Sequence, residues 1–154
     1  MRLKAHAIVR AAERTGKPFA SVMLEAAERH LRRRLLVLQH GDELMVDLPA
    51  AARLEHGDCL LAEDGRLVEV IAAAEDLLAA TAGKGLRLAE LAWHLGNRHV
   101  EAQVEPDRIL VRRDAVIGDL LGRLGATVSE VREPFSPLGG AYGHGADHGH
   151  GHGH

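Results

Sequence analysis

The first half of the chain carries short apolar runs that turn residues break at close intervals. Two expected strands flank the turn at 40–43, with apolar positions at Val37, Leu44, Val46 and Leu48. Another turn is expected at 55–58. Asp64-Gly65 separates the apolar runs 60–61 and 67–71, which predicts a hairpin with a tight type I′ turn because Asp-Gly readily takes positive φ angles. The pattern predicts a small all-β domain over residues 1–72.

The second half of the chain changes to helical spacing. A helix is predicted from about 86 to 95, followed by Gly96-Asn97, which can adopt the left-handed conformation that ends a helix. A second helix is predicted to begin at Asp114, whose carboxylate can cap it, and to close at Gly125. The apolar positions of the two helices are Leu88, Leu91, Ala92 and Leu95, then Ile117, Leu120, Leu121 and Leu124.

Strands are expected around these helices. One lies within 71–82, a hairpin pairs 100–104 with 109–111 across the turn 105–107, and a last strand covers 127–131. The order strand, helix, strand, strand, helix, strand predicts a ferredoxin-like βαββαβ domain over 73–138, with both helices on one sheet face. The fold class is therefore α+β. A domain of this size buries a modest core, so pairing of two chains would stabilise it.

Residues 139–154 contain nothing that could pack a core and are expected to form a flexible Gly/His-rich tail. Its histidines are His144, His148, His150, His152 and His154. Neutral imidazole binds borderline divalent metals such as Ni(II), Zn(II), Cu(II) and Co(II), whereas calcium and magnesium prefer oxygen ligands. A purification tag is the alternative, but such a tag is usually an uninterrupted histidine run, and this segment is dilute and includes Asp147.

His99 is the second metal candidate, because it lies just past the first predicted helix. One histidine per chain cannot hold an ion, yet in a two-fold dimer His99 of both subunits can meet at the axis. The remaining coordination positions would stay open for tail histidines or water, as a site that releases its metal requires. A structural or merely solvated histidine is the alternative interpretation.

The other histidines favour no metal site. His94 precedes His99 by five residues, about 140° around a helix, so the two do not form the same-face pair of a zinc protease. Four further histidines are expected to be ordinary surface residues: His6, His30, His40 and His56. We find no nucleophile with a neighbouring base, phosphate-cradling loop or acid pair, so an enzyme is the least favoured class.

Composition adds few constraints. The formal net charge is −3, so the overall balance does not favour nucleic acid or an anionic membrane. No apolar run approaches the ~20 residues that span a bilayer, and the first six residues lack the features of a signal peptide, which predicts a cytoplasmic protein. Cys59 is the single cysteine; we expect it to be buried as a small apolar residue.

The basic run 29–34 has three interpretations: a nucleic-acid contact, a partner-docking face or a plain solvated face. The run is short and lacks interleaved aromatic residues for base stacking, which disfavours nucleic acid.

The motif His94-Leu95-Gly96-Asn97-Arg98-His99, with Gln103 four residues further on, resembles the signature of the UreE family of urease accessory proteins. Pro134-Phe135-Ser136-Pro137, then 140–143 and a histidine-rich end, are similar to that family's C-terminus. The resemblance covers nearly the whole chain. It implies a peptide- or partner-binding first domain and a metal-binding second domain. It also implies a homodimer formed by the second domain, with Ni(II) held by His99 of both subunits and helped by the tail.

The resemblance further implies a nickel metallochaperone and not an enzyme, which delivers Ni(II) to apo-urease through the GTPase UreG and associated accessory proteins. Some relatives carry further histidines at a strand-to-helix junction, where this chain has Arg112 and Arg113. Arginine has no lone pair to donate, so we expect no auxiliary metal site there. A general His-rich divalent-metal storage protein, not dedicated to urease, remains the alternative.

Overall fold

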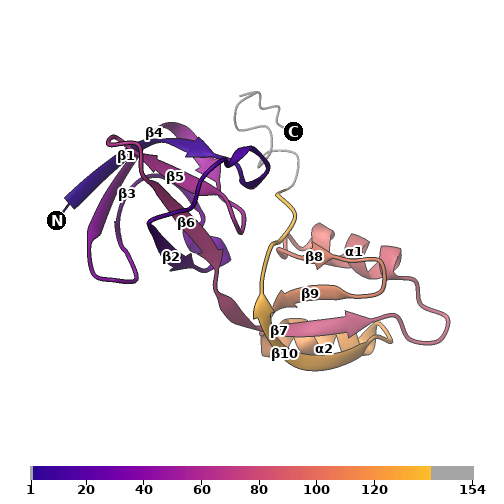
Figure 1. Ribbon diagram of the computed structural model, residues 1–154. Helices are drawn as coiled ribbons and strands as arrows, with labels where there is room; N and C mark the ends of the chain where they lie inside the picture. Colours follow the sequence, from indigo (N-terminus) through magenta and orange to yellow (C-terminus); the bar gives the residue numbers. More distant parts are fainter. Residues whose placement is uncertain (1, 140–154) are drawn as a thin grey trace. The chain divides into compact units, whose positions relative to one another are not determined.

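The computed structural model describes residues 2–139, which form two compact units that meet in the sequence between Ala73 and Ala74 (Figure 1). The predicted tail lies outside the described residues except for Gly139. In the described part of the chain, no helix has the length and apolar content needed to cross a membrane.

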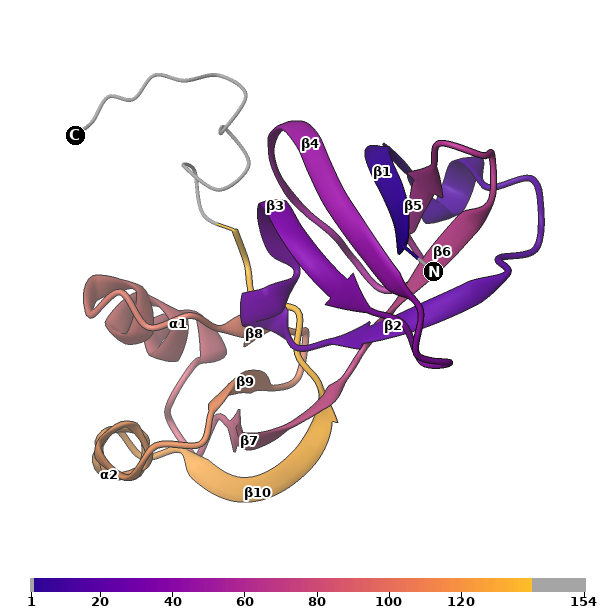
Figure 2. The same ribbon diagram turned by 90° about the vertical axis from the view of Figure 1, so that its left-hand side faces the viewer.

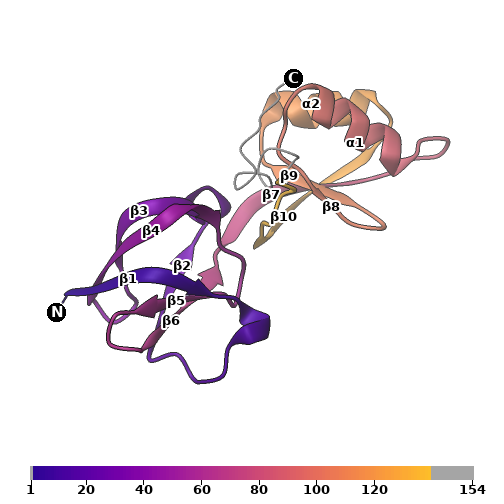
Figure 3. The same cartoon turned by 90° about the horizontal axis from the view of Figure 1, so that it is seen from above.

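The first unit is a six-stranded sheet in the order β2-β6-β5-β1-β4-β3, curved around an aliphatic core (Figure 3). Its elements are β1 (Arg2–Val9), the short 3-10 helix η1 (Ala11–Glu13), β2 (Ala20–Leu24), the 3-10 helix η2 (Ala26–Glu28), β3 (His30–Val37), β4 (Glu43–Arg53), β5 (Cys59–Ala62) and β6 (Leu67–Ala72). The β character predicted for this half is confirmed. We predicted no individual strand at the position of β1, which lies inside the sheet and pairs with β4 and β5.

The hairpin between β5 and β6 is confirmed, but its predicted type I′ turn is wrong. Among the described residues other than glycine only His99 has a positive φ, so of Asp64-Gly65 only Gly65, at 91°, is left-handed. Ala62 and Arg66 close a three-residue loop through Ala62 N–H to Arg66 O, at 2.9 Å. The Gly65 N–H donates to Ala62 O at 2.9 Å and the φ of Asp64 is not positive, which fits a type I turn followed by a left-handed glycine. The Asp64 carboxylate accepts the Arg66 N–H at 3.0 Å.

The basic run at 29–34 is not one solvated face. Arg29 is fully buried, where its guanidinium donates to the carbonyls of Leu24 and Leu54. Arg33 is exposed and pairs with Asp47 on β4 at 3.2 Å. Arg29 is the residue that ends η2 and lies before β3, whereas the three arginines on β3, Arg32, Arg33 and Arg34, are all exposed. Cys59 is fully buried, as predicted.

The second unit has the predicted order of elements. They are β7 (Ala74–Thr81), α1 (Leu88–Asn97), β8 (Gln103–Val104), β9 (Ile109–Arg112), α2 (Ala115–Arg123) and β10 (Thr127–Pro134). The antiparallel sheet runs β10-β7-β9-β8, and both helices lie on one side of it (Figure 2). Leu91 and Leu95 of α1 and Leu121 of α2 pack there against Leu78, Ala80, Ile109 and Val111 of the sheet. A β-rich first unit followed by a unit of strands and helices is therefore confirmed.

The end signals of the helices are only partly as predicted. Asp114 caps α2 by accepting the Ile117 N–H at 3.0 Å, and Gly125 follows the helix with φ 92°, as expected. α1 begins two residues later than predicted and continues through Gly96 and Asn97, because the left-handed residue that ends it comes later.

Candidate metal centre

The end of α1 is built on His99. The N–H of His99 donates to Gly96 O and the N–H of Val100 to Leu95 O, both at 3.0 Å. These two bonds define a Schellman motif, in which the residue just past the helix is left-handed and is usually glycine. Here that residue is His99, with φ 57°.

A left-handed conformation is unfavourable for a residue with a Cβ, by roughly 1–2 kcal/mol. His99 is the only residue other than glycine with a positive φ among those described. Leu95, whose carbonyl closes the motif, is fully buried, and Val100 packs against the same core, so the packed helix holds His99 in place. Strain of this kind concentrates at functional sites, which makes the backbone an independent reason to single out His99.

The side chain of His99 is exposed and makes no hydrogen bond or ion pair with any described residue. Within residues 2–139, no group of three or more His, Cys, Asp or Glu side chains could hold a metal ion. The described part of one chain therefore does not contain a complete donor set, and His99 would have to share an ion with ligands from elsewhere.

His94 differs from His99 in its surroundings. It is half-buried on α1, and its ring lies edge-on to Trp93 with the centroids 5.0 Å apart. Its carbonyl accepts a hydrogen bond from the Arg98 guanidinium at 3.3 Å, which satisfies one of the last free carbonyls of the helix. Trp93 itself is 64% exposed, so the helix that ends at His99 presents a large aromatic surface to solvent.

Three histidines of the first unit have structural contacts. His56 Nδ1 accepts the Ala72 N–H at 3.1 Å, and His40 lies edge-on to Phe19 and 3.4 Å from the Asp42 carboxylate. His6 contacts Glu63 through Nε2 at 2.6 Å, and this hydrogen bond raises the pKa of His6 above its ordinary value. His30 is exposed on β3.

The junction between β9 and α2, where we expected no auxiliary metal site, is occupied by Arg112 and Arg113, which make structural contacts. Arg112 forms ion pairs with Glu101 and Glu75, and its guanidinium lies 5.0 Å from the centre of the Phe135 ring. Arg113 donates to Val131 O at 3.0 Å. These side chains fasten β9 to its neighbours.

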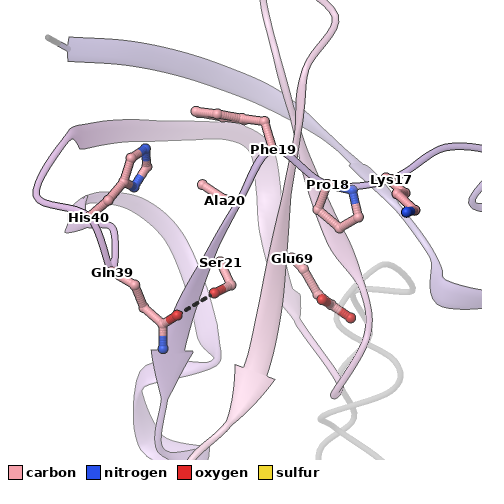
Figure 4. A pocket seen from close by; sticks show the side chains of 8 residues that line it. All are labelled: Lys17, Pro18, Phe19, Ala20, Ser21, Gln39, His40 and Glu69. Carbon is pink, nitrogen blue, oxygen red and sulfur yellow. Dashed lines mark hydrogen bonds between the residues drawn. The ribbon is translucent and has the colours of Figure 1, made fainter.

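The first unit has a hollow that no pattern in the sequence had predicted (Figure 4). It has a volume of about 490 Å³ and lies beside Phe19 and His40, where the Ser21 hydroxyl donates to the Gln39 side-chain oxygen at 2.7 Å. Phe19 also lies under the Arg66 guanidinium at 4.1 Å. An aromatic wall with polar groups at its rim suits an organic ligand or peptide better than a bare metal ion.

The sequence analysis proposed five tail histidines as metal ligands. They are His144, His148, His150, His152 and His154, and all of them lie outside the described residues.

Comparison with known proteins matches both units. The family model for the N-terminal domain of the UreE urease accessory protein matches residues 3–73, and the model for its C-terminal domain matches residues 75–154. The chain is 53% identical over 128 residues to the urease accessory protein UreE of Ruegeria pomeroyi, covering 83% of this chain and 84% of that one. It is 51% identical over 145 residues to UreE of Mesorhizobium japonicum, covering 94% and 74%. For UreE of Agrobacterium fabrum the identity is 52% over 135 residues, covering 85% and 84%.

These matches cover both units and reach half identity over most of the chain. The chain therefore belongs to the UreE family of urease accessory proteins, a family of accessory proteins and not of enzymes.

Proposed function

We propose that this protein is a nickel metallochaperone that binds Ni(II) between two copies of the chain and delivers it to apo-urease in the cytoplasm. The observation that carries the proposal is His99, an exposed imidazole without a described partner, held in a strained conformation at the end of a packed helix. Two such rings at a two-fold axis give two nitrogen ligands, which suit a borderline ion such as Ni(II).

The tail histidines complete the proposed site. Two His99 rings leave coordination positions open, and His144, His148, His150, His152 and His154 or water would fill them. Ligands that exchange readily allow the ion to leave, as delivery requires. Zn(II), Cu(II) and Co(II) suit the same nitrogen ligands and are expected to compete in vitro.

The second unit fits the role of dimerisation and metal-binding domain. Its element order and its sheet order, in which the last strand lies beside the first, support classifying it as ferredoxin-like. The exposed Trp93 on α1 supplies the kind of aromatic surface that is enriched at protein interfaces. The first unit, with its hollow beside Phe19, would bind peptides or partners, including the GTPase UreG and the associated accessory proteins.

Calorimetric titration with Ni(II) tests this proposal. The intact chain, a chain ending at Gly143 and the His99→Ala form of each are compared, with His56→Ala as a matched exposed histidine in the first unit. The shortened chain is expected to bind about one Ni(II) per two chains, and His99→Ala is expected to abolish this binding whereas His56→Ala leaves it unchanged. Loss of all nickel with the tail would instead favour the general His-rich storage protein.

A further inference from the structure

The curved sheet of the first unit is almost closed, because its two end strands, β2 and β3, meet at one point. There the Gln39 N–H, two residues past β3, donates to Ser21 O of β2 at 3.0 Å. The pairings through the rest of the sheet make β2 and β3 run in opposite directions, so a continued ladder would next pair Met23 with Val37. Among the described residues this pair is not formed, and Figure 2 shows the two strands separating toward the start of β3. We call these two unpaired edges, Met23 on β2 and residues 33–37 on β3, the seam.

The seam has backbone groups without partners. Successive residues of an antiparallel strand turn their N–H and C=O alternately toward the paired strand and away from it. The Leu38 N–H donates to Asp42 O, so the even-numbered residues of β3 turn toward β4. The odd-numbered residues of β3 therefore turn their backbone groups to the seam, as Met23 does on β2, two residues after Ser21. No described residue binds these groups at the three positions Met23, Leu35 and Val37.

Large apolar side chains lie along the same edges. Leu36 and Leu38 point into the core, so Leu35 and Val37, which alternate with them, lie on the outer face. Leu35 is 40% exposed, Val37 is 63% exposed and Met23 on β2 is 53% exposed. An unpaired strand edge flanked by exposed apolar side chains is a template on which an extended peptide adds as a further strand.

The charges on β3 decide between two occupants of this edge. Arg32, Arg33 and Arg34 are all exposed. Arg33 pairs with Asp47 and Arg32 donates to Leu48 O, whereas Arg34 makes no hydrogen bond or ion pair with any described residue. Pairing of β3 with β3 of a second copy would bring two such runs of arginines together, which is unfavourable for like charges on paired strands. A peptide with an acidic side chain beside Arg34 is favoured by the same charges.

We propose that the seam binds an extended peptide of a partner protein, which adds to β3 as an antiparallel strand. The backbone groups of Leu35 and Val37 pair with the peptide, and residues opposite one another share a face. From its N-terminus the peptide therefore reads apolar opposite Val37, any residue, apolar opposite Leu35, and acidic opposite Arg34. This proposal rests on the peptide-binding role given to the first unit in the proposed function, and it places that role at the seam and not in the hollow beside Phe19.

Hydrogen exchange of the full chain, measured by NMR, tests the proposal with the acetylated and amidated peptide Thr-Val-Thr-Val-Glu-Thr. The amides of Leu35 and Val37 are expected to exchange at least about tenfold more slowly when the peptide is saturating, because they then donate to it. The Leu36 amide, which already turns to β4, is the internal control and is expected to be protected with and without peptide. No protection of Leu35 and Val37 at millimolar peptide overturns the proposal. Protection only around Phe19 and Ser21 overturns it as well, since the peptide would then occupy the hollow.

A charge exchange tests the predicted acidic position without disturbing the core. Arg34→Glu is expected to weaken binding of the peptide about fivefold in calorimetric titrations, and a peptide with lysine in place of its glutamate is expected to prefer the Arg34→Glu form by a similar factor. Arg123→Glu, at an exposed position on α2, is the matched control and should leave both affinities unchanged. An equal loss in both variants, or no preference of the lysine peptide for Arg34→Glu, contradicts the assignment.

The outcomes separate this proposal from the nickel site. Arg34→Glu is expected to leave the Ni(II) titration of the full chain unchanged, because Arg34 lies in the first unit and His99 in the second. A chain that binds nickel through His99 but shows no protection at the seam loses only the present proposal. A chain that protects the seam but binds no nickel through His99 has lost the proposed metallochaperone function instead.

Discussion

His99 of the second unit differs in its environment from three histidines of the first unit. In the first unit His6, His40 and His56 each contact a carboxylate, an aromatic ring or a backbone N–H, and none has a left-handed backbone. In the second unit His99 has a left-handed backbone, and its exposed ring makes no hydrogen bond or ion pair with any described residue. The contacts of His6, His40 and His56 give each of these histidines a structural role. His99 combines a left-handed backbone with an exposed ring that has no described partner, and this combination makes it the proposed metal ligand.

The comparison of the two units presumes that each has its own core. Substitutions in these cores are expected to have the largest effect on the free energy of unfolding. Leu60 and Leu91 are both fully buried, the first in the core of the first unit and the second in that of the second. Replacement of either by alanine is expected to destabilise its own unit by about 2–5 kcal/mol. Trp93 is the single tryptophan and lies on α1, so its fluorescence in urea should report Leu91→Ala and not Leu60→Ala. Equal shifts of the Trp93 transition would mean that the units unfold together.

Backbone strain gives an intermediate effect with opposite signs in the two units. At His99, glycine relieves the left-handed strain, so His99→Gly is expected to be more stable than His99→Ala by roughly 1 kcal/mol. At His56, whose φ is not positive, glycine only adds freedom to the unfolded chain, and His56→Gly should be the less stable of its pair. Urea unfolding of the four variants measures both differences. If the glycine variant is more stable than the alanine variant at both positions, or less stable at both, backbone strain at His99 is contradicted.

The smallest expected effect is a pH dependence in the first unit. The hydrogen bond to Glu63 raises the folded-state pKa of His6 above its ordinary value of 6.5. Its contribution to stability is therefore fully present below pH 6.5 and is lost as the pH rises through the folded pKa. Exchange of His6 for glutamine should flatten this part of the stability profile. A His6 imidazole that titrates below 6.5 by NMR would contradict the assignment.

Much of the second unit could be predicted because its signals are local. The carboxylate of Asp114 and the left-handed glycine at 125 act within one turn of α2, and both were found where the sequence placed them. The end of α1 was misplaced because Gly96 is a better left-handed residue than His99, and only the packed core around Leu95 makes the helix continue. Propensity alone does not contain that tertiary constraint.

The candidate site was only partly predictable. Its motif pointed to His99, but the left-handed backbone that distinguishes His99 from other exposed histidines needs coordinates. Gln103 was noted as part of the motif without a role, because its partner Ser136 is 33 residues away. In the same way, no local pattern announces that Arg29 is buried under carbonyls from two other segments.

The most direct test of the account is the position of the metal. Crystals of the chain ending at Gly143, grown with one Ni(II) per two chains, would be measured on both sides of the nickel absorption edge. We expect a single strong anomalous peak on a two-fold axis, bound by the His99 ring of each subunit. A peak bound elsewhere, or paired subunits whose His99 rings lie far apart and face away from each other, would contradict the account.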